Sequence, residues 1–385
     1  MIGINPLVWQ QLTYQKSRLF VSILGVTFSV SLMFIQMGFR DGLFENSVTL
    51  HHALDADLVL IHQDTNYFFD LKTFPRRFIY NILGIIEVKS AQPFYFYFAD
   101  LKNPQTLVSR RISIGAFPPD KSVFKLEGVQ KNLEIIKQED TFLFDRLSRS
   151  EYGPIASQVE TNRAVTTELA NRKIKIGGLF SLGGGVMSAD GLLVTSDLNY
   201  SRLLNIPLEK VNMGVIKIDS GIDPESVIPR ISAKLPSNLK VITLEKFMEI
   251  EKEYWSNSTP IGFIFNLGTI IGCLFGGIIV YQILYTQISD NLYIYATFKA
   301  IGYTNFYLVG IVLKQAMLIS IMGYLPGFIV CLYLYDFVRD ATRLPMSMTF
   351  SRALIVGFLT IAMCSLASLL AMNKLRFADP AELFR

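Results

Sequence analysis

The residue types that usually carry catalysis are few and scattered in this chain. Its three histidines are His51, His52 and His62, and their spacing matches no zinc-binding motif. The glycine-rich stretch GGLFSLGGGV at 177–186 lacks the lysine of a phosphate-binding loop, and no serine-hydrolase elbow occurs. We therefore expect no catalytic residue, no metal site and no directly bound cofactor, and we expect the histidines at the surface or between domains.

A short polar and aromatic segment is the second place where chemistry could occur. It reads SDNLYIYATFKAIGYTN at 289–305, begins at the last residue of a 36-residue run without a charge (254–289) and precedes another apolar run. Its spacing predicts a short amphipathic helix that ends at a glycine C-cap. The side chains that could contact a soluble partner are one acid, one base, three apolar or aromatic residues and the capping glycine: Asp290, Leu292, Tyr295, Phe298, Lys299 and Gly302. The alternative is an interfacial turn whose aromatic residues lie among lipid headgroups.

The elements around this segment are long and apolar. The 385-residue chain is 51% hydrophobic and 18% charged, whereas soluble proteins carry about 25% charged residues. A spanning helix needs about 20 mostly apolar residues, and four such stretches occur, at 19–39, 260–284, 305–335 (apolar core 315–335) and 353–373. The sequence thus predicts an α-helical membrane protein with four transmembrane helices and a large extracytoplasmic α+β domain between the first and the second.

Basic residues predict the orientation of these spans. Short segments that would share one side of the membrane hold a group of bases: Lys16, Arg18, Lys299, Lys374, Arg376 and Arg385. Because cytoplasmic segments are the ones enriched in Lys and Arg, the termini are expected in the cytoplasm. An amphipathic surface helix at 1–18, a helix at 285–304 and a tail at 374–385 would lie there. Residues 40–259 and a loop at 336–352 would lie outside the inner membrane.

Residues 40–259 are typical of an α+β sheet domain rather than a barrel. Alternating or β-branched runs such as DADLVLIH and PFYFYFAD predict strands. Residues 214–244 predict a strand, an amphipathic helix that begins at Asp223, and a second strand. Internal breaks are expected near 74–75 and 150–154. The net charge of +4 is too small to indicate a nucleic-acid partner.

The stretch LEKFMEIEKEYW at 244–255 predicts a helix that runs into the second span. Tyr254 and Trp255 would then lie at the outer membrane interface, where aromatic side chains are enriched.

The predicted spans hold almost no ionisable residues, so coupling to protons or sodium has little support. Gly272 and Gly276 form a Gly-x3-Gly spacing in the second span, which predicts close helix packing or dimerisation. Pro326, between Gly323 and Gly327, predicts a kink in the third span.

Three further motifs are YATFKAIGYTN at 295–305, VLKQAMLISIMGYLPG at 312–327 and LRFADPAELFR at 375–385. They resemble the FtsX/MacB superfamily of ABC-transporter permeases, most closely its DevC-type branch from cyanobacteria. The N-terminal stretch PLVWQQLTYQKSRLFVSILGVTFSV is also similar to the family. The motif-level resemblance is confined to the first 50 residues and to 286–385, and residues 40–259 are similar to the family only in size and coarse pattern.

The resemblance implies a MacB-like architecture and a non-catalytic permease that works as a homodimer. It implies that a separate ABC ATPase subunit binds ATP and Mg²⁺ and docks on the loop that holds the six residues named above. Further implied partners are a membrane-fusion protein, a TolC-like outer-membrane channel and membrane lipids, with an amphiphile such as a glycolipid as cargo. Two residues depart from the family: Ile294 stands where an acid is common, and Tyr293 where proline is common in the branch.

Two other functions remain open beside the exporter. One is a lipoprotein-extraction permease, with the same topology and a different cargo. The other is an FtsX-like regulator of a cell-wall hydrolase, which would move no cargo. The size of residues 40–259 favours the two transporters, because the outer domain of such regulators is usually smaller. An enzyme is the least favoured alternative.

Overall fold

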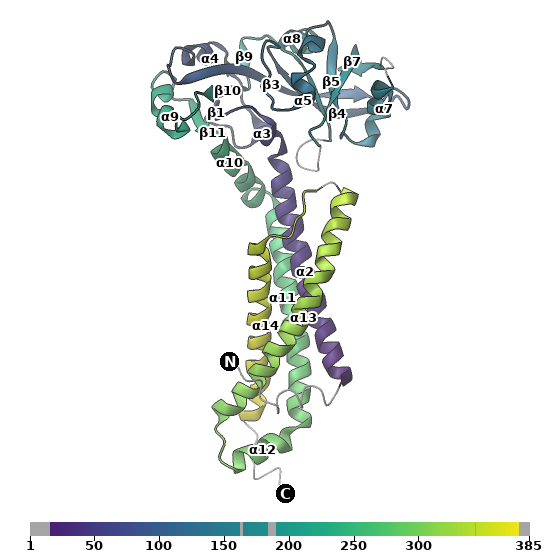
Figure 1. The fold of residues 1–385 in the computed structure, drawn as a ribbon, viewed down its shortest axis with the longest axis vertical. Coiled ribbons are helices and arrows are strands. Elements are labelled where there is room, and N and C mark those ends of the chain that lie inside the picture. The colour runs from purple at the N-terminus through teal and green to yellow at the C-terminus, as the bar shows by residue number, and fades with distance from the viewer. Residues whose placement is uncertain (1–15, 162–164, 184–189, 343, 377–385) are drawn as a thin grey trace. The chain divides into compact units, whose positions relative to one another are not determined.

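The computed structural model describes residues 16–161, 165–183, 190–342 and 344–376. For residues 374–376 it describes the backbone only. The chain forms two compact units, one of Met1–Gly42 with Pro260–Arg385 and one of Leu43–Thr259. The ribbon of each unit is drawn in Figure 1. The helix expected at 1–18 and the tail expected at 374–385 lie mostly outside the described residues.

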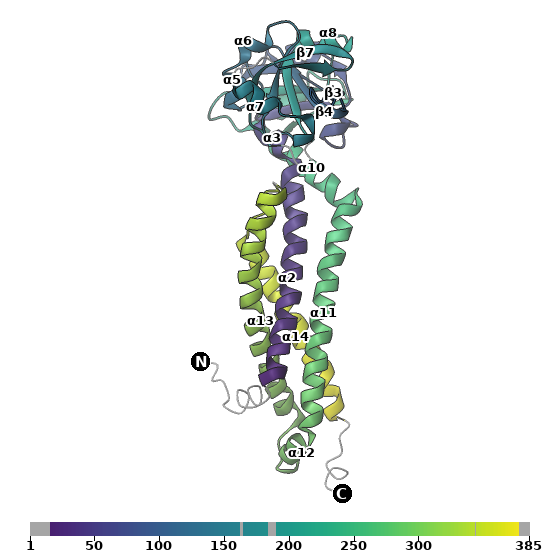
Figure 2. The ribbon, with the colours of Figure 1, turned by 90° about the vertical axis from the view of Figure 1, so that its right-hand side faces the viewer.

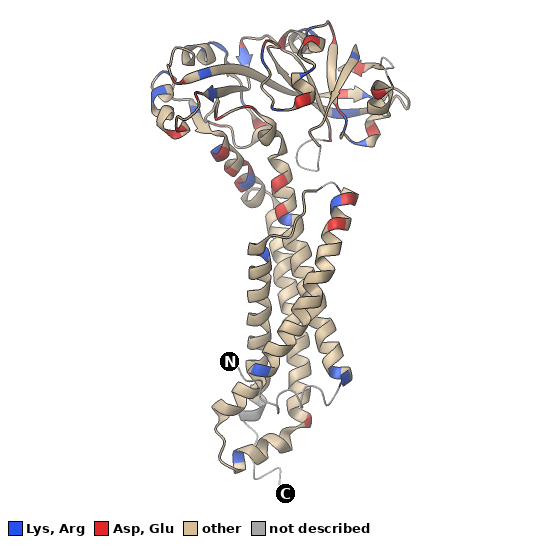
Figure 3. Cartoon of the chain, in the orientation of Figure 1, with Lys and Arg blue, Asp and Glu red and all other residues tan. Residues whose placement is uncertain are grey.

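The first unit consists mainly of four long helices. They are α2 (Lys16–Ser47), α11 (Pro260–Asp290), α13 (Asn305–Thr342) and α14 (Phe350–Arg376). Each is long and apolar enough to cross a membrane, and each contains one of the four predicted spans and extends beyond its predicted bounds. Charged side chains lie mostly toward the helix ends, as Figure 3 shows. Large apolar side chains such as Phe28, Ile278 and Phe358 are exposed along the helices, a surface that suits lipid rather than water.

Small residues bring α2 close to two of the other helices. Ser29 Oγ donates to the Gly272 carbonyl of α11 at 2.5 Å, and Thr27 Oγ1 donates to the Gly323 carbonyl of α13 at 3.1 Å. A side chain at Gly323 would collide with Val26, 2.5 Å away. The predicted close packing at Gly272 and Gly276 is therefore found between helices of one chain, and α13 continues as one helix through Pro326.

The neighbouring glycines 276 and 277 give a matched test of this packing. A Cβ at Gly276 would lie 2.7 Å from Met363 Sδ and in contact with Ser29, whereas no described atom lies within 4 Å of a Cβ at Gly277. Overpacking costs about 1–3 kcal/mol, and both changes gain the same helix propensity. We expect the thermal unfolding temperature of the detergent-solubilised chain to be several degrees lower for Gly276→Leu than for Gly277→Leu, which should not fall below the unchanged chain. Equal shifts would contradict the packing.

A buried arginine joins three of these helices near one end of the unit. Arg352 of α14 is 5% exposed; its Nη2 lies 2.8 Å from Asp41 Oδ2 of α2, and its Nη1 donates to the Ser347 carbonyl at 2.7 Å. Tyr335 of α13 donates to the Phe34 carbonyl of α2. Because a buried charge without its partner is strongly destabilising, this network fixes α2 against α13 and α14 at that end.

The second unit is built on a nine-stranded sheet in the order β11-β1-β10-β3-β4-β8-β5-β7-β6, with a separate β2-β9 pair. The strands are β1 (Leu58–His62), β2 (Phe74–Pro75), β3 (Val88–Lys102), β4 (Ser109–Phe117), β5 (Thr141–Asp145), β6 (Val165–Leu169), β7 (Arg172–Phe180), β8 (Leu192–Ser196), β9 (Lys210–Val211), β10 (Met213–Ile218) and β11 (Leu239–Thr243). The pairs β4–β8 and β5–β7 are parallel and the other pairs are antiparallel.

Short helices surround this sheet. They are α3 (Thr49–Ala53), η1 (Phe68–Asp70), α4 (Arg77–Ile82), α5 (Glu127–Gln130), α6 (Leu133–Ile136), η2 (Ser150–Tyr152), α7 (Ile155–Glu160), α8 (Asp197–Leu204), α9 (Pro224–Ser232) and α10 (Leu244–Asn257). The α+β character that the sequence predicts is confirmed.

The long strand β3 organises the sheet, because its two halves pair with different strands. Residues 88–94 pair with β10, and residues 95–102 pair with β4. Leu101 of β3 also pairs with Leu169 of β6. Strands β3, β4, β8, β5, β7 and β6 thus form a ring that closes at a single residue pair, so the expectation of a plain sheet rather than a barrel is wrong for this half.

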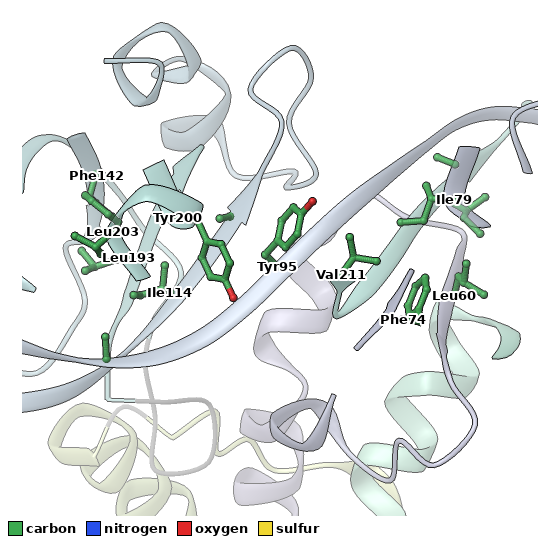
Figure 4. Packing of buried hydrophobic residues seen from close by; sticks show 14 of the residues in the cluster. Leu60, Phe74, Ile79, Tyr95, Ile114, Phe142, Leu193, Tyr200, Leu203 and Val211 are labelled. Atoms are coloured by element: carbon green, nitrogen blue, oxygen red, sulfur yellow. The ribbon is translucent and has the colours of Figure 1, made fainter. Parts of the chain in front are cut away.

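The two faces of the sheet are covered by separate apolar clusters, as period-2 alternation requires. In β1, Leu58 and Leu60 belong to one cluster and Val59 and Ile61 to the other. The first cluster includes the ring pair Tyr95–Tyr200, whose centroids are 5.3 Å apart and whose rings are labelled in Figure 4.

Two sequence expectations for this unit have different outcomes. The strand–helix–strand pattern at 214–244 is confirmed as β10, α9 and β11, and Asp223 Oδ1 accepts the Glu225 amide at the start of α9. The expected breaks near 74–75 and 150–154 are wrong, because Leu43–Thr259 is one compact unit. Phe74–Pro75 is a paired strand, and Ser150–Tyr152 is a helical turn with a buried tyrosine.

Candidate functional site

A short helix, α12 (Leu292–Ala300), connects α11 to α13 at one end of the helical unit; Figure 2 shows it there. It ends in a Schellman motif: the Gly302 amide donates to the Lys299 carbonyl and the Tyr303 amide to the Phe298 carbonyl, both at 3.0 Å. Gly302 has φ +104°, a conformation that glycine adopts without strain. A short helix is found within the predicted range 285–304 and ends at Gly302 as expected, but it is shorter than predicted because α11 continues to Asp290.

One face of α12 is covered by the rest of the unit. Tyr295 is 1% exposed, Ala296 is also buried, and the Tyr295 side chain is hydrogen-bonded to that of Gln315 in α13. Leu292 and Lys299 lie on either side of this buried strip and are half-buried. Because its side chain is enclosed, Tyr295 anchors α12 to α13 and is not placed to contact a partner directly.

The remaining predicted site residues lie at the two ends of α12. Arg18 Nη1 of α2 lies 2.5 Å from Asp290 Oδ2 at the end of α11. Phe298 is half-buried, and its ring lies edge-on to that of Tyr303 at 5.5 Å. Asp290 is thus already paired within the chain, although an exposed ion pair contributes only about 0–1 kcal/mol and can exchange partners.

The opposite face of α12 is exposed and apolar. Tyr293 is 62% exposed and Ile301 is 69% exposed, with Ile294 exposed on the same side. Tyr303 and Phe306, just beyond the helix, are exposed as well. The sequence did not single out these residues as contact residues, because α12 is apolar on nearly every side and hydrophobic spacing could not tell the covered face from the open one.

A second cluster of interest lies inside the sheet unit, where a histidine and a glutamate are both fully buried. His51 Nε2 of α3 lies 3.8 Å from Glu251 Oε2 of α10. Glu251 Oε2 accepts the Phe68 amide at 2.6 Å, and its Oε1 accepts the Trp255 indole N–H at 2.9 Å. The imidazole packs edge-on against Phe68 and Phe247, and neither of its nitrogens has a hydrogen-bond partner among the described residues.

Burial dominates the ionisation of this pair. It raises the pKa of Glu251 to about 7, although the Phe68 amide and the Trp255 indole favour the ionised form. It lowers the pKa of His51 to about 3, so the imidazole is neutral near neutral pH. The expectation of a surface position for His51 is therefore wrong.

The cluster lies close in sequence to both points where the chain passes from one unit to the other. Lys252 Nζ lies 2.6 Å from Glu45 Oε2, and His52 Nε2 lies 3.3 Å from Glu45 Oε1. Tyr254 stacks on Tyr67 with ring centroids 4.0 Å apart. Tyr254 and Trp255 therefore pack against residues of the sheet unit, and their position at the outer membrane interface stays a prediction.

No group of three or more His, Cys, Asp or Glu side chains is placed to hold a metal ion in the part of the chain that the structure describes.

Comparison with known proteins gives one family match. Residues 255–380 match the family described as FtsX-like permease C-terminal. This range includes α11, α12, α13 and α14. No curated protein matches the chain.

Two solved structures are similar to part of the chain. One is the periplasmic region of MacB from Actinobacillus actinomycetemcomitans, with 8% identity, coverage of 55% of this chain and 97% of that chain, and a TM-score of 0.37. The other is the extracellular domain of the ABC-type transporter YknZ from Gram-positive bacteria, with 8% identity, coverage of 49% and 98%, and a TM-score of 0.33. At these low TM-scores the two likenesses carry no argument about fold or function.

The comparisons leave the resemblance to the DevC-type branch as a prediction. The family match covers about a third of the chain. For residues 255–380 the chain is similar to FtsX-like permeases, and this match, with four apolar helices of membrane-spanning length, supports an ABC-transporter permease.

Proposed function

We propose that this chain is the membrane-spanning permease subunit of a tripartite ABC exporter. It would pass the force of ATP hydrolysis, carried out by a separate subunit, to its sheet unit. The family match of residues 255–380 supports the permease part. The observation that carries the rest is α12, a short helix with an exposed apolar face that is held between two helices of membrane-spanning length.

In this proposal the exposed face of α12 is the docking surface for the ATPase subunit, which binds ATP and Mg²⁺. Tyr293, Ile294 and Ile301 would be buried on docking, and apolar burial contributes about 25 cal/mol per Å². The covered face of α12 is fixed to α13 through Tyr295, and Asp290 at the end of α11 pairs with Arg18 of α2. A push on α12 would therefore move the attached helices as rigid bodies.

The movement would reach the sheet unit through the two chain segments that link the units. On the sheet-unit side these segments are joined to each other by the Glu45–Lys252 ion pair and by the contact of His51 with Glu251. Segments joined in this way cannot shift independently without breaking buried contacts. We infer that they move the sheet unit as one body.

The remaining parts of the proposal follow the family resemblance. Two copies form a homodimer in the inner membrane, with the termini and α12 in the cytoplasm and Leu43–Thr259 in the periplasm. A membrane-fusion protein and a TolC-like channel complete the export path, and the cargo is an amphiphile such as a glycolipid.

Affinity purification of the tagged full-length chain in mild detergent tests this function. We expect an ABC ATPase subunit to co-purify, together with a membrane-fusion protein and an outer-membrane channel. A lipoprotein carrier in place of the last two would indicate lipoprotein extraction, and a cell-wall hydrolase would indicate a regulator. The complete absence of an ATPase under conditions that preserve other membrane complexes would overturn the proposal.

A further inference from the structure

We propose that a groove in the sheet unit binds an anionic amphiphile, a molecule with an apolar chain and a carboxylate or phosphate head. The groove has a volume of about 570 Å³. Its binding chemistry stands on the contacts described below, whereas the view that the amphiphile is transported cargo rests on the proposed function.

The groove lies where β3 stops pairing with β10. Strand β10 pairs with β3 only as far as Phe94, while β4 continues alongside β3 to Lys102. Just beyond this point, the Asn212 side chain accepts the Phe96 amide at 2.9 Å in place of a strand neighbour. The side chains of β3 from Phe96 to Phe98 therefore line an opening rather than an interface between strands.

One wall of the groove is aromatic. The rings of Phe69, Phe96 and Phe98 contact one another with centroids 5.2–5.8 Å apart. Phe98 is only half-buried. Aromatic side chains bury 150–250 Å² each when fully covered, so an apolar chain laid against this wall would gain area that water now covers.

The charged groups of the groove are all basic. Arg111 and Lys210 line it, and no aspartate or glutamate does. The Arg111 guanidinium carbon lies 4.4 Å from the centre of the Phe98 ring, which holds the donor groups of the guanidinium beside the apolar wall. Within the described residues neither base has a carboxylate at ion-pair distance, whereas the adjacent Arg110 pairs with Asp190 at 2.6 Å.

These two features select the ligand class. An inorganic anion would leave the phenylalanine wall in water, and a neutral amphiphile would leave the two bases without a partner. A molecule with an apolar body and an anionic head satisfies both, because charge-assisted hydrogen bonds and apolar burial act in the same site.

The test uses the full-length chain in nanodiscs of phosphatidylcholine. The probe is lauric acid that carries a diazirine, and cross-linked peptides are mapped by mass spectrometry. We expect labelling of the peptides that contain Phe69 and Phe98, and we expect octyl phosphate to compete for it better than octyl glucoside or inorganic phosphate. Arg111→Gln combined with Lys210→Gln should reduce this labelling about tenfold.

The control is Lys89→Gln with Lys125→Gln, which removes the same charge from exposed positions outside the groove. This variant should label like the unchanged chain, and labelling of the membrane helices should stay constant in all variants. Groove labelling that survives the Arg111/Lys210 change, or equal competition by octyl glucoside, would overturn the proposal. Competition by an acidic peptide but not by octyl phosphate would also overturn it.

The exporter function and the amphiphile-binding groove can be refuted independently of each other. The Arg111/Lys210 variant should still co-purify with the ATPase subunit, because neither residue lies in α12. Loss of the ATPase from the unchanged chain would refute the exporter and leave the groove result intact.

Discussion

Tyr293→Asp combined with Ile301→Lys is expected to reduce co-purification of the ATPase subunit about tenfold or more while the chain remains folded. Both side chains lie on the open face of α12, and the loss of two buried apolar contacts exceeds the 1.4 kcal/mol that corresponds to tenfold. Tyr293 is in the first turn of α12 and Ile301 directly follows its last residue. An acid near the start and a base near the end of a helix stabilise it, so α12 itself should persist.

A matched pair of exposed apolar residues in the sheet unit supplies the control. Leu198→Asp with Ile86→Lys introduces the same two charges, again without changing the net charge, at positions that are 68% and 93% exposed. Leu198 is the second residue of α8, where an acid is also favourable. This control should bind the ATPase like the unchanged chain. Retention of the ATPase by the α12 variant would place the docking surface elsewhere.

The helices of the first unit could be predicted because each span is specified by its own residues. About 20 apolar residues in a row admit few structures other than a spanning helix, and Gly302 ended α12 where the sequence placed its C-cap. The exposed face of α12 could not be predicted. Tyr295 is covered because Gln315, from the next helix, lies over it, and no local pattern carries that information.

In the sheet unit too, features set by neighbouring residues could be predicted from the sequence, and features set by contacts between distant residues could not. Alternation predicted the strands, and Asp223 predicted the start of α9, because both signals are local. The closure of the ring depends on one pair, Leu101 with Leu169, and the burial of His51 depends on Phe68, Phe247 and Glu251. These contacts join residues far apart in the sequence, so neither could be predicted from spacing.

The second large expected effect is a pH dependence of stability in the sheet unit, caused by the buried pair of His51 and Glu251. The pKa of Glu251 is about 7 in the folded chain, above its ordinary value of 4.5. The folded state thus holds a proton that the unfolded state releases, and stability falls as pH rises from 4.5 through 7. The pKa of His51 is about 3, below its ordinary 6.5, so its contribution is complete above pH 6.5 and is lost as pH falls toward 3.

The two contributions oppose each other, and we expect stability to be nearly constant between pH 4.5 and 6.5. Glu251→Gln removes the contribution of the carboxyl and leaves that of His51, so stability should rise with pH up to 6.5. His51→Phe removes the other and should make stability fall across pH 4.5–7, by about 3 kcal/mol for a shift of this size. Glu45, which lies between His52 and Lys252, is the same in all variants and does not alter the comparison.

Trp255 reports on this pair directly, because its indole donates to Glu251. The chain has two tryptophans, Trp9 and Trp255, so a Trp9→Phe background isolates the signal. The fluorescence emission of Trp255 should titrate with a midpoint near pH 7. Thermal unfolding followed by this emission should show that stability rises with pH for Glu251→Gln and falls with pH for His51→Phe. Parallel slopes in the two variants would mean that burial neither keeps the Glu251 carboxyl protonated nor keeps a second proton off the His51 imidazole. The contact between the two linking segments would then depend on the Glu45–Lys252 ion pair and on the aromatic rings around His51.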